Sequence, residues 1–332
     1  MNDAEPASLA HELARIMEAI EIAGPLHIRF AGEAVAVAAD APNPGVSALQ
    51  AYLYQHCYCR HVDNASPGQA NAEPSPDTLA AELASANASQ DRWSAGWQIT
   101  DLLPAGQIIA GKAALSRPAW PGEFMTHAGP GMPPQLGAAV SLFAPRGSPT
   151  VQPGFYIAFG ETLGDWHDHQ GVVRFYWNVR ASGAAELMRM VTATLNRFQV
   201  PFQFKCLSHP AGYPRADAAV LYVARRHYRI AAHLVADFLP RLDTSLLSPV
   251  PLFTKCLAPG LGFAEDPGNG ESFGMHRCRL LAEAAWRAQA NGKAGVAARM
   301  DTLRAVFDEN GLGVDAPYLN RGSPDDYPFP VH

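Results

Sequence analysis

The chain has 332 residues, of which 48% are hydrophobic and 17% charged, and its 25 basic and 31 acidic residues give a net charge of −6. This composition predicts a soluble globular protein with a sizeable core, in one large domain or two smaller ones. No apolar run approaches the ~18–20 residues that span a bilayer, and the N-terminus lacks a basic segment followed by an apolar one. We therefore expect neither a membrane protein nor an exported one.

The five cysteines form no Cys-x-x-Cys pair, which favours reduced thiols in a cytoplasmic protein over a disulfide framework. Acidic residues dominate the first 150 positions, where 14 acidic residues face 7 basic ones, whereas 17 acidic and 18 basic residues follow. The acidic first half argues against nucleic acid as a partner. The second half has the cations that an anionic substrate needs.

Helical periodicity opens the chain. Residues 8–23 carry apolar side chains every three or four positions and predict an amphipathic helix. Further helices are expected at 46–60 and 79–88, on either side of a linker at 61–78 that is rich in Asn, Ser, Pro and Gly. We therefore predict a helical N-terminal region over residues 1–90, which either docks a leader peptide or partner protein or forms a structural cap.

Short β-like runs follow, separated by Pro and Gly clusters. They lie at 96–103, 107–115, 138–143 and 155–159. The order is then strand 171–179, helix 183–198, strand 201–207, strand 217–224, helix 227–242, strand 250–257, loop 258–273, helix 275–291 and helix 294–309, before a Pro-rich tail. This uneven alternation predicts an α+β domain over residues 91–332, with a mixed, mainly antiparallel sheet and flanking helices, rather than a doubly wound parallel sheet.

One predicted strand concentrates polar groups on a single face. Arg174, Tyr176 and Asn178 alternate with Phe175 and Trp177, and the period of two places the three polar side chains together. Such a face is either solvated or lines a cleft.

Lysine is scarce in this chain, and two of its four lysines sit in similar runs, PFQFKCL around Lys205 and PLFTKCL around Lys255. Chance, or two strands of similar structure, explains the similarity of the two runs. Lys205 lies among apolar residues, where desolvation and neighbouring guanidinium groups would favour a neutral amine able to act as a base. A lysine whose stem lies along a sheet edge explains the same pattern.

Two arginines are candidate phosphate ligands. Arg215 precedes a predicted strand, where its guanidinium either pairs with Asp217 or binds a phosphate oxygen pair. Arg277 follows a glycine-rich loop in the first turn of a helix capped by Ser272, and helix N-termini favour anions. The loop has no Walker lysine, so an ordinary capped helix start explains it as well.

A metal site and a serine hydrolase are weaker interpretations. Asp165, His167 and His169 fall within five residues, as in a metal-binding loop, but no third His or Cys follows at a motif distance. A polar hairpin loop explains them more simply. The Gly-x-Ser-x-Gly elbow of serine hydrolases is absent from the sequence.

Six runs, taken in order, resemble a known family. They are GFYIAFG (154–160), VRFYWNV (173–179), VPFQFK (200–205), YPRADAAVLYV (213–223), PLFTKCLAPGLGFAEDP (251–267) and GESFGMHRCRLLAEA (270–284). The set resembles the Hop-A effector-like family, named after a type III secreted effector of plant pathogens, over roughly residues 93–292. The ordered set is specific, whereas no single run is diagnostic.

The resemblance implies a lyase of bacterial thioamitide and class V lanthipeptide pathways. Such proteins are regarded as eliminating phosphate from phosphorylated Ser or Thr of a precursor peptide, which leaves dehydroalanine or dehydrobutyrine. The implied partners are the phosphorylated precursor peptide, a separate Ser/Thr kinase or phosphotransferase, expected to act as a complex, and a cyclase. The elimination implied by the resemblance requires no cofactor or metal, and the composition argues against nucleic acid and a membrane as partners.

The order of polar groups is also similar to that of phosphothreonine lyases. On that resemblance Arg174 matches the first basic position, Tyr176 the general acid two residues later, and Lys205 the base. Arg215 and Arg277 match two phosphate-binding arginines. Those lyases have histidine at the acid position.

The tyrosine at that position leaves three sources for the leaving-group proton. Tyr176 donates it, His276 supplies it from the glycine-rich loop, or the phosphate leaves as its dianion held by arginines. A second function remains open, that of a non-catalytic phosphopeptide-binding or effector-like partner of a kinase or cyclase. A metal-dependent hydrolase using His167 and His169 is the third interpretation.

Overall fold

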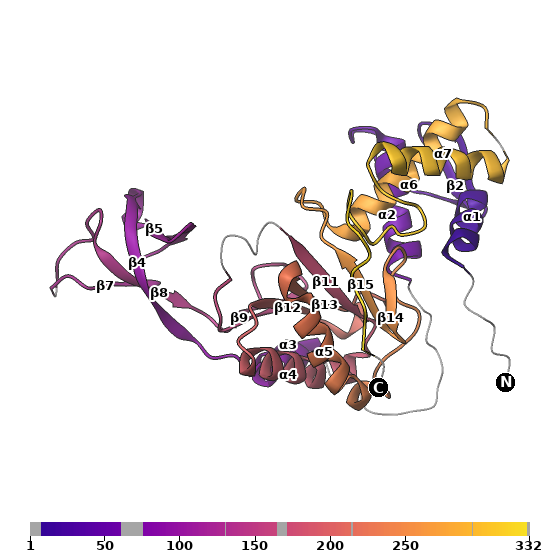
Figure 1. Ribbon diagram of the computed structural model, residues 1–332. Helices are drawn as coiled ribbons and strands as arrows, with labels where there is room; N and C mark the ends of the chain where they lie inside the picture. The colour runs from indigo at the N-terminus through magenta and orange to yellow at the C-terminus, as the bar shows by residue number, and fades with distance from the viewer. Residues whose placement is uncertain are drawn as a thin grey trace.

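The computed structural model describes residues 8–60, 76–129, 131–164, 171–213, 215–293 and 295–330 (Figure 1). The predicted linker falls outside these residues as far as position 75, and so does the loop with Asp165, His167 and His169. Within the described ranges, no helix combines the length and the apolar character needed to cross a membrane.

A seven-stranded sheet forms the body of the molecule, and each of its strand pairs is antiparallel. Its strand order is β14 (Lys255–Ala258), β15 (Leu261–Glu265), β11 (Val172–Trp177), β13 (Ala219–Ala224), β12 (Phe202–Leu207), β10 (Phe155–Phe159) and β9 (Gly147–Ser148). The predicted α+β class with a mainly antiparallel sheet is therefore confirmed.

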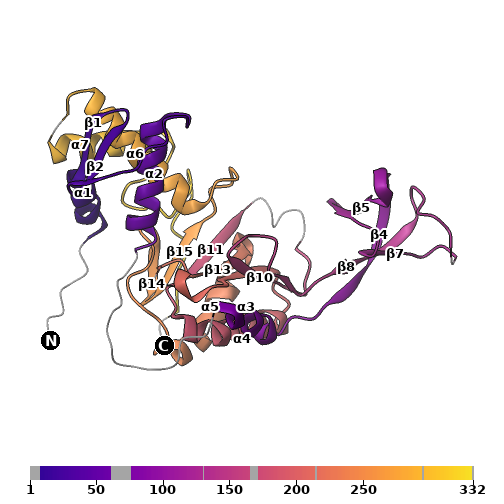
Figure 2. The same cartoon turned by 180° about the vertical axis from the view of Figure 1, so that it is seen from behind.

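Helices cover one face of this sheet. Helices α3 (Pro76–Ala86), α4 (Ala181–Arg197) and α5 (Tyr228–Phe238) lie along it (Figures 1 and 2). Phe175, Trp177 and Phe204 point into this layer and are fully buried. Because strand side chains alternate, their neighbours Arg174, Tyr176 and Lys205 must point to the opposite face.

The opposite face is covered at one end. Helices α2 (Pro44–Leu53), α6 (Phe273–Ala290) and α7 (Val296–Glu309) form a second core with the π-helical turn Tyr54–Tyr58. Tyr58 and Phe273 of this core pack on Tyr176. We call the remaining part of this face, around Arg174, Lys205 and Tyr222, the polar face.

The N-terminal region is not purely helical. Helix α1 (Leu9–Ala19) is shorter than predicted, and a small sheet follows it, made of β1 (Ile20–Gly24), β2 (His27–Phe30) and β3 (Glu33–Ala34). Helices α1 and α2 pack against α7 and α6, and α3 packs against α4. Helices from both ends of the chain thus share one core, and a unit boundary at residue 90 stays a prediction.

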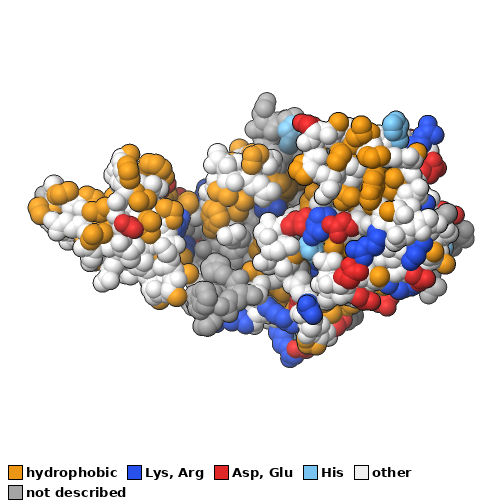
Figure 3. All heavy atoms as spheres, turned by 90° about the horizontal axis from the view of Figure 1, so that it is seen from above, with side chains coloured by type: hydrophobic (Ala, Val, Ile, Leu, Met, Phe, Trp, Pro, Cys, Tyr) orange, Lys and Arg blue, Asp and Glu red, His pale blue; other side chains and the backbone are white. Residues whose placement is uncertain are grey.

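A third sheet, of five strands, projects from the body, and we call it the arm (Figure 1). Its order is β6 (Leu115–Ala119), β5 (Ile108–Lys112), β4 (Arg92–Leu102), β8 (Ala139–Ala144) and β7 (Phe124–Thr126). Trp97, Ile99, Ile108 and Val140 build a small core of its own. Figure 3 shows hydrophobic side chains over the arm surface, and exposed Trp93, Trp120 and Met125 are among the large hydrophobic residues there.

The predicted loop 258–273 is wrong in part, because β15 lies within it. All five residues of β15 are buried, so the strand has no polar–apolar alternation that would mark it. Gly260 precedes it with φ +73°, a conformation that glycine adopts without strain. This strand pairs with β11 and thereby brings Asp266 next to Arg174.

The C-terminal tail closes the body. Tyr318 accepts a hydrogen bond from the Glu265 amide through its carbonyl, at 2.8 Å, and the Asn320 amide donates to the Glu265 carboxylate. The Tyr327 ring packs 4.4 Å from that of Phe263 and 4.7 Å from that of Tyr228. The tail therefore contacts both strand β15 and helix α5 and holds them together.

Gly274 of α6 is a position where only glycine fits. A Cβ there would lie 2.7 Å from Cδ1 and Cζ of the Tyr58 ring, which packs over the end of the polar face. We expect Gly274→Ala to lower the free energy of unfolding by about 1–3 kcal/mol, because the ring has to move. Urea unfolding measures the change.

Gly313→Ala is the matched control for this substitution. Its added Cβ would have no neighbour closer than the Ala316 nitrogen at 4.0 Å. Equal stability of the two variants would contradict the close packing of α6 on Tyr58.

Candidate functional site

The polar face is assembled from three neighbouring strands. Tyr222 of β13 is the register partner of Arg174 on β11, and Val220 is the partner of both Tyr176 and Lys205. Directly opposed residues of antiparallel strands share a face. The structure therefore brings Arg174, Tyr176 and Lys205 onto one surface, with the ring of Tyr222 between Arg174 and Lys205.

Lys205 is half-buried among aromatic rings. Its Nζ lies 4.4 Å from the ring centroid of Phe155 and 5.6 Å from that of Tyr222, and it donates a 3.2 Å hydrogen bond to Oε1 of Gln152. Within the part of the chain that the structure describes, no carboxylate lies within ion-pair distance of this amine. The amine of Lys205 is thus held by two aromatic rings and an amide oxygen, without a carboxylate beside it among the described residues.

Arg174 lies on the other side of the Tyr222 ring, with its guanidinium carbon 5.1 Å from the ring centroid. Its Nε donates to Asp266 at 2.8 Å, and its Nη2 donates to the same carboxylate. Burial acts to lower the pKa of Arg174, but Tyr176, Tyr222 and Asp266 together raise it. The guanidinium is therefore a permanent cation, and the fork to Asp266 leaves its Nη1 for another acceptor.

Tyr176 lies at the covered end of the polar face, and its hydroxyl is enclosed by protein. Burial raises the pKa of Tyr176 well above its ordinary value, while Arg174 and Tyr58 oppose that rise. The oxygen makes no hydrogen bond of normal geometry to a described residue. The phenol consequently keeps its proton at any ordinary pH.

Arg215 stands apart from these groups, in the loop before β13. Its Nε and Nη2 donate to Asp217 at 2.5 and 2.8 Å, and Nη2 also donates to the Tyr54 hydroxyl at 3.0 Å. Among the described residues the guanidinium hydrogen-bonds to Asp217 and Tyr54, and no hydrogen bond joins it to Lys205 or Arg174.

Arg277 is fully buried and holds the C-terminal tail. Its Nε donates to the Pro317 carbonyl at 2.7 Å and its Nη2 to the Leu319 carbonyl at 3.1 Å. Burial lowers the pKa of Arg277 to about 10. In this arrangement the guanidinium binds backbone oxygens, and its predicted role as a phosphate ligand stays a prediction.

His276 is the partner of Arg277 on the same turn of α6. Its Nδ1 lies 2.6 Å from Nη1 of Arg277, and because guanidinium only donates, Nδ1 accepts. Burial, and then the charges of Arg277 and Arg279, lower the pKa of His276 to about 4. The imidazole is neutral near pH 7, which makes it a weak source of a proton.

Three residues of this surface were missed from sequence. Tyr222 sits in phase with Arg174 and could have been found from the alternation of the predicted strand at 217–224. Asp266 and Gln152 reach Arg174 and Lys205 from segments 92 and 53 residues away, and no local signal marks them.

The lowered pKa of His276 makes stability depend on pH. The folded pKa of about 4 lies below the ordinary 6.5, so the unfolded chain binds a proton first as the pH falls. The stabilisation is complete above pH 6.5 and is lost toward pH 4, by on the order of 2–3 kcal/mol. We expect His276→Gln to flatten this part of the profile, measured by urea unfolding between about pH 7 and about pH 4.5.

His11→Gln, at an exposed position of α1, is the control for that profile. A His276→Gln profile that runs parallel to those of the unmodified protein and this control would contradict the neutral, buried imidazole.

Comparison with known proteins shows which family the chain resembles. The model of the HopA1 effector protein family matches residues 147–319, which include all six predicted site residues and exclude the arm. No curated protein matches the chain.

Two solved effector structures are similar. The effector protein from Pseudomonas syringae pv. tomato strain DC3000 is 15% identical, with a TM-score of 0.50 over 94% of this chain and 96% of that one. The effector protein from Pseudomonas syringae pv. syringae strain 61 is 16% identical, with a TM-score of 0.37 over 50% and 63% of the two chains. The family match and the fold shared with the first of these effectors agree with the resemblance seen in the sequence, and the chain belongs to the HopA1 effector protein family.

Proposed function

We propose that this protein is a phospho-Ser/Thr lyase. It eliminates phosphate from phosphorylated Ser or Thr of a ribosomal precursor peptide during lanthipeptide or thioamitide maturation. One observation supports this function above the others, namely that Lys205 and Arg174 contact the ring of the same Tyr222 on the polar face. A base beside a permanent cation is what elimination of a phosphate requires.

The reaction breaks two bonds and forms one double bond. The Lys205 amine takes the Cα proton of the phosphorylated residue, and the electron pair of that C–H bond becomes the new C=C bond. The Cβ–O bond breaks and its electrons leave with the phosphate. Arg174 stabilises the charge that gathers on the bridging oxygen through the donors that Asp266 does not use.

The geometry favours one of the three sources for the leaving-group proton. His276 is neutral, since its pKa lies near 4, and the Tyr176 phenol is enclosed beneath Tyr58 and Phe273. We therefore favour an ester that enters as its monoanion, so that phosphate leaves as the hydrogen phosphate dianion and no acid is needed. Direct proton donation by Tyr176 stays the second possibility.

Arg215 and Arg277 are proposed as further phosphate ligands, but each would have to give up hydrogen bonds that it makes in this structure. Arg215 would have to share its guanidinium with Asp217, and Arg277 would have to release tail carbonyls. Arg174 is the arginine best placed beside Lys205 in the described structure, because both side chains contact the ring of Tyr222.

The proposed partners follow from the chemistry. A separate kinase or phosphotransferase must supply the phosphorylated peptide, and a cyclase can add a cysteine thiol to the resulting alkene. The elimination as written needs neither metal nor nucleotide, so activity is expected to persist with a chelator.

Lys205→Ala is expected to lower the rate of elimination by about 10²–10⁴-fold, the usual contribution of a general base. Lys205→Arg keeps the charge without a base of suitable strength, and we expect a loss of similar size. Mass spectrometry of a phosphothreonine peptide measures the rate, and fluorescence anisotropy measures the Kd of the same peptide.

Lys255→Ala is the matched control, since its sequence context is nearly the same but its Nζ is paired with Asp325 at 2.7 Å. It is expected to leave elimination unchanged. If Lys205→Ala keeps full turnover, the lyase is refuted. If the unmodified protein binds the phosphopeptide without eliminating phosphate, and Lys205→Ala weakens Kd only a few-fold, the chain is the non-catalytic binding partner instead.

A further inference from the structure

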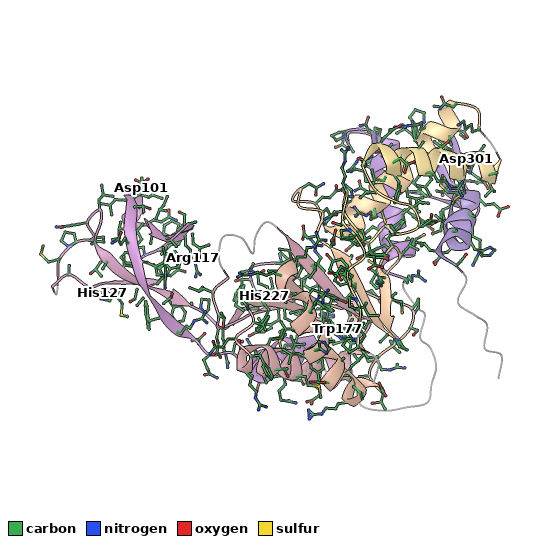
Figure 4. The ribbon with its side chains drawn as sticks, viewed as in Figure 1. Asp101, Arg117, His127, Trp177, His227 and Asp301 are labelled. Atoms are coloured by element: carbon green, nitrogen blue, oxygen red, sulfur yellow. The ribbon has the colours of Figure 1, made fainter. Side chains whose placement is uncertain are left out.

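A cavity of about 580 Å³ lies between the arm and the seven-stranded sheet. From the arm it is lined by Arg92, Trp97 and Arg117, and from the sheet by Gln203 and Tyr222. Figure 4 shows Arg117 on the side of the arm that faces the body. Its size is in the range of pockets that bind small ligands or a few residues of a peptide.

The cavity continues into the polar face. Tyr222 lines the cavity, and its ring also contacts Lys205 and Arg174. Gln203 is the register partner of Tyr222 and precedes Lys205 by two residues on the same face of β12. A peptide whose phosphorylated residue lies at Lys205 therefore has a path along these two side chains into the cavity.

The lining sets the chemistry of an occupant. Its apolar part includes Leu115, Phe159 and Phe202, which suit an uncharged or apolar stretch of peptide. Arg117 and Arg92 are close enough for the charge of Arg117 to lower the pKa of Arg92, in addition to the larger effect of burial.

These two arginines are not neutralised by a carboxylate. Glu161 is the acidic group that opposes this effect on Arg92, yet its Oε1 accepts from the Gln90 amide at 3.0 Å. In the described ranges, neither Arg92 nor Arg117 has a carboxylate within ion-pair distance. Two neighbouring cations that repel each other gain most from an anionic group placed between them.

We propose that this cavity binds the stretch of substrate peptide next to the phosphorylated residue, and that Arg92 and Arg117 select an acidic side chain in that stretch. The inference rests on the proposed function for the placement of the phosphate at Lys205. This proposal gives the arm a role in substrate selection, although the arm lies outside residues 147–319, which match the family.

The test measures peptide binding in a Lys205→Ala background, so that no turnover takes place. The probes are two fluorescein-labelled peptides with a central phosphothreonine, one with Asp and one with Ala at the second and third positions on both sides. We expect the Asp peptide to bind on the order of tenfold more tightly, as a charge pair in a partly enclosed site allows. Adding Arg117→Ala or Arg117→Gln is expected to remove that preference and leave binding of the Ala peptide nearly unchanged.

Charge reversal sharpens the result. With Arg117→Glu, a third peptide carrying Lys at the same positions is expected to bind more tightly than the Asp peptide. Arg304→Ala is the control, because Arg304 is an exposed arginine of α7 paired with Asp301. Equal binding of the Asp and Ala peptides, or a preference that survives both Arg117→Gln and Arg117→Glu, would overturn the proposal.

The proposed lyase function is tested separately, by measuring elimination of phosphate with the protein that retains Lys205. Elimination from the Asp peptide that is no more efficient than from the Ala peptide, and that is unaffected by Arg117→Gln, would refute the peptide subsite and keep the lyase. Selection of the Asp peptide by Arg117 without elimination would keep the subsite and refute the lyase.

Discussion

The alternation of side chains across the central strands constrains everything else in this molecule. Phe175, Trp177 and Phe204 have to be buried against the helices on one face, so Arg174, Tyr176 and Lys205 necessarily share the other. A shift of register by one residue would bury the cations and expose the aromatic core, at a cost that no local interaction offsets. The polar face is thus fixed by the hydrophobic core behind it.

The basic residues of the predicted site differ in whether a carboxylate is paired with them. Arg174 is paired with Asp266 and Arg215 with Asp217, whereas Lys205 is held by rings and by Gln152. A paired guanidinium keeps its place and loses part of its attraction for a free anion. Among the described residues Lys205 has no paired carboxylate, which is why the proposed chemistry centres on its amine.

The sequence predicts this surface well where the pattern is local. Period two placed Arg174 and Tyr176 together, and the ordered runs indicated the family. The lysine proposed as the base could not be chosen from local sequence, since Lys205 and Lys255 have almost the same neighbours in the chain. What distinguishes them is their place in the sheet, because Lys255 lies on edge strand β14 within reach of Asp325 in the tail, while Lys205 lies on an inner strand.

Contacts between distant segments account for what was missed. The strand β15 is buried on both faces and lacks a polar–apolar period, so its pairing with β11 and the approach of Asp266 were not predictable. The roles of the arginines likewise depend on partners far along the chain, as Arg277 with Pro317 shows. The projection of the arm, and hence the cavity beside the polar face, also follows from tertiary structure alone.

The most direct test of the central claim is the fate of the bridging oxygen. A phosphothreonine peptide is incubated with the protein in water enriched in heavy oxygen, and the released phosphate and the peptide are weighed by mass spectrometry. Elimination predicts phosphate with no heavy oxygen from the water and a peptide that contains dehydrobutyrine. Phosphate that carries heavy oxygen, with threonine restored in the peptide, would mean attack of water on phosphorus and would contradict the lyase.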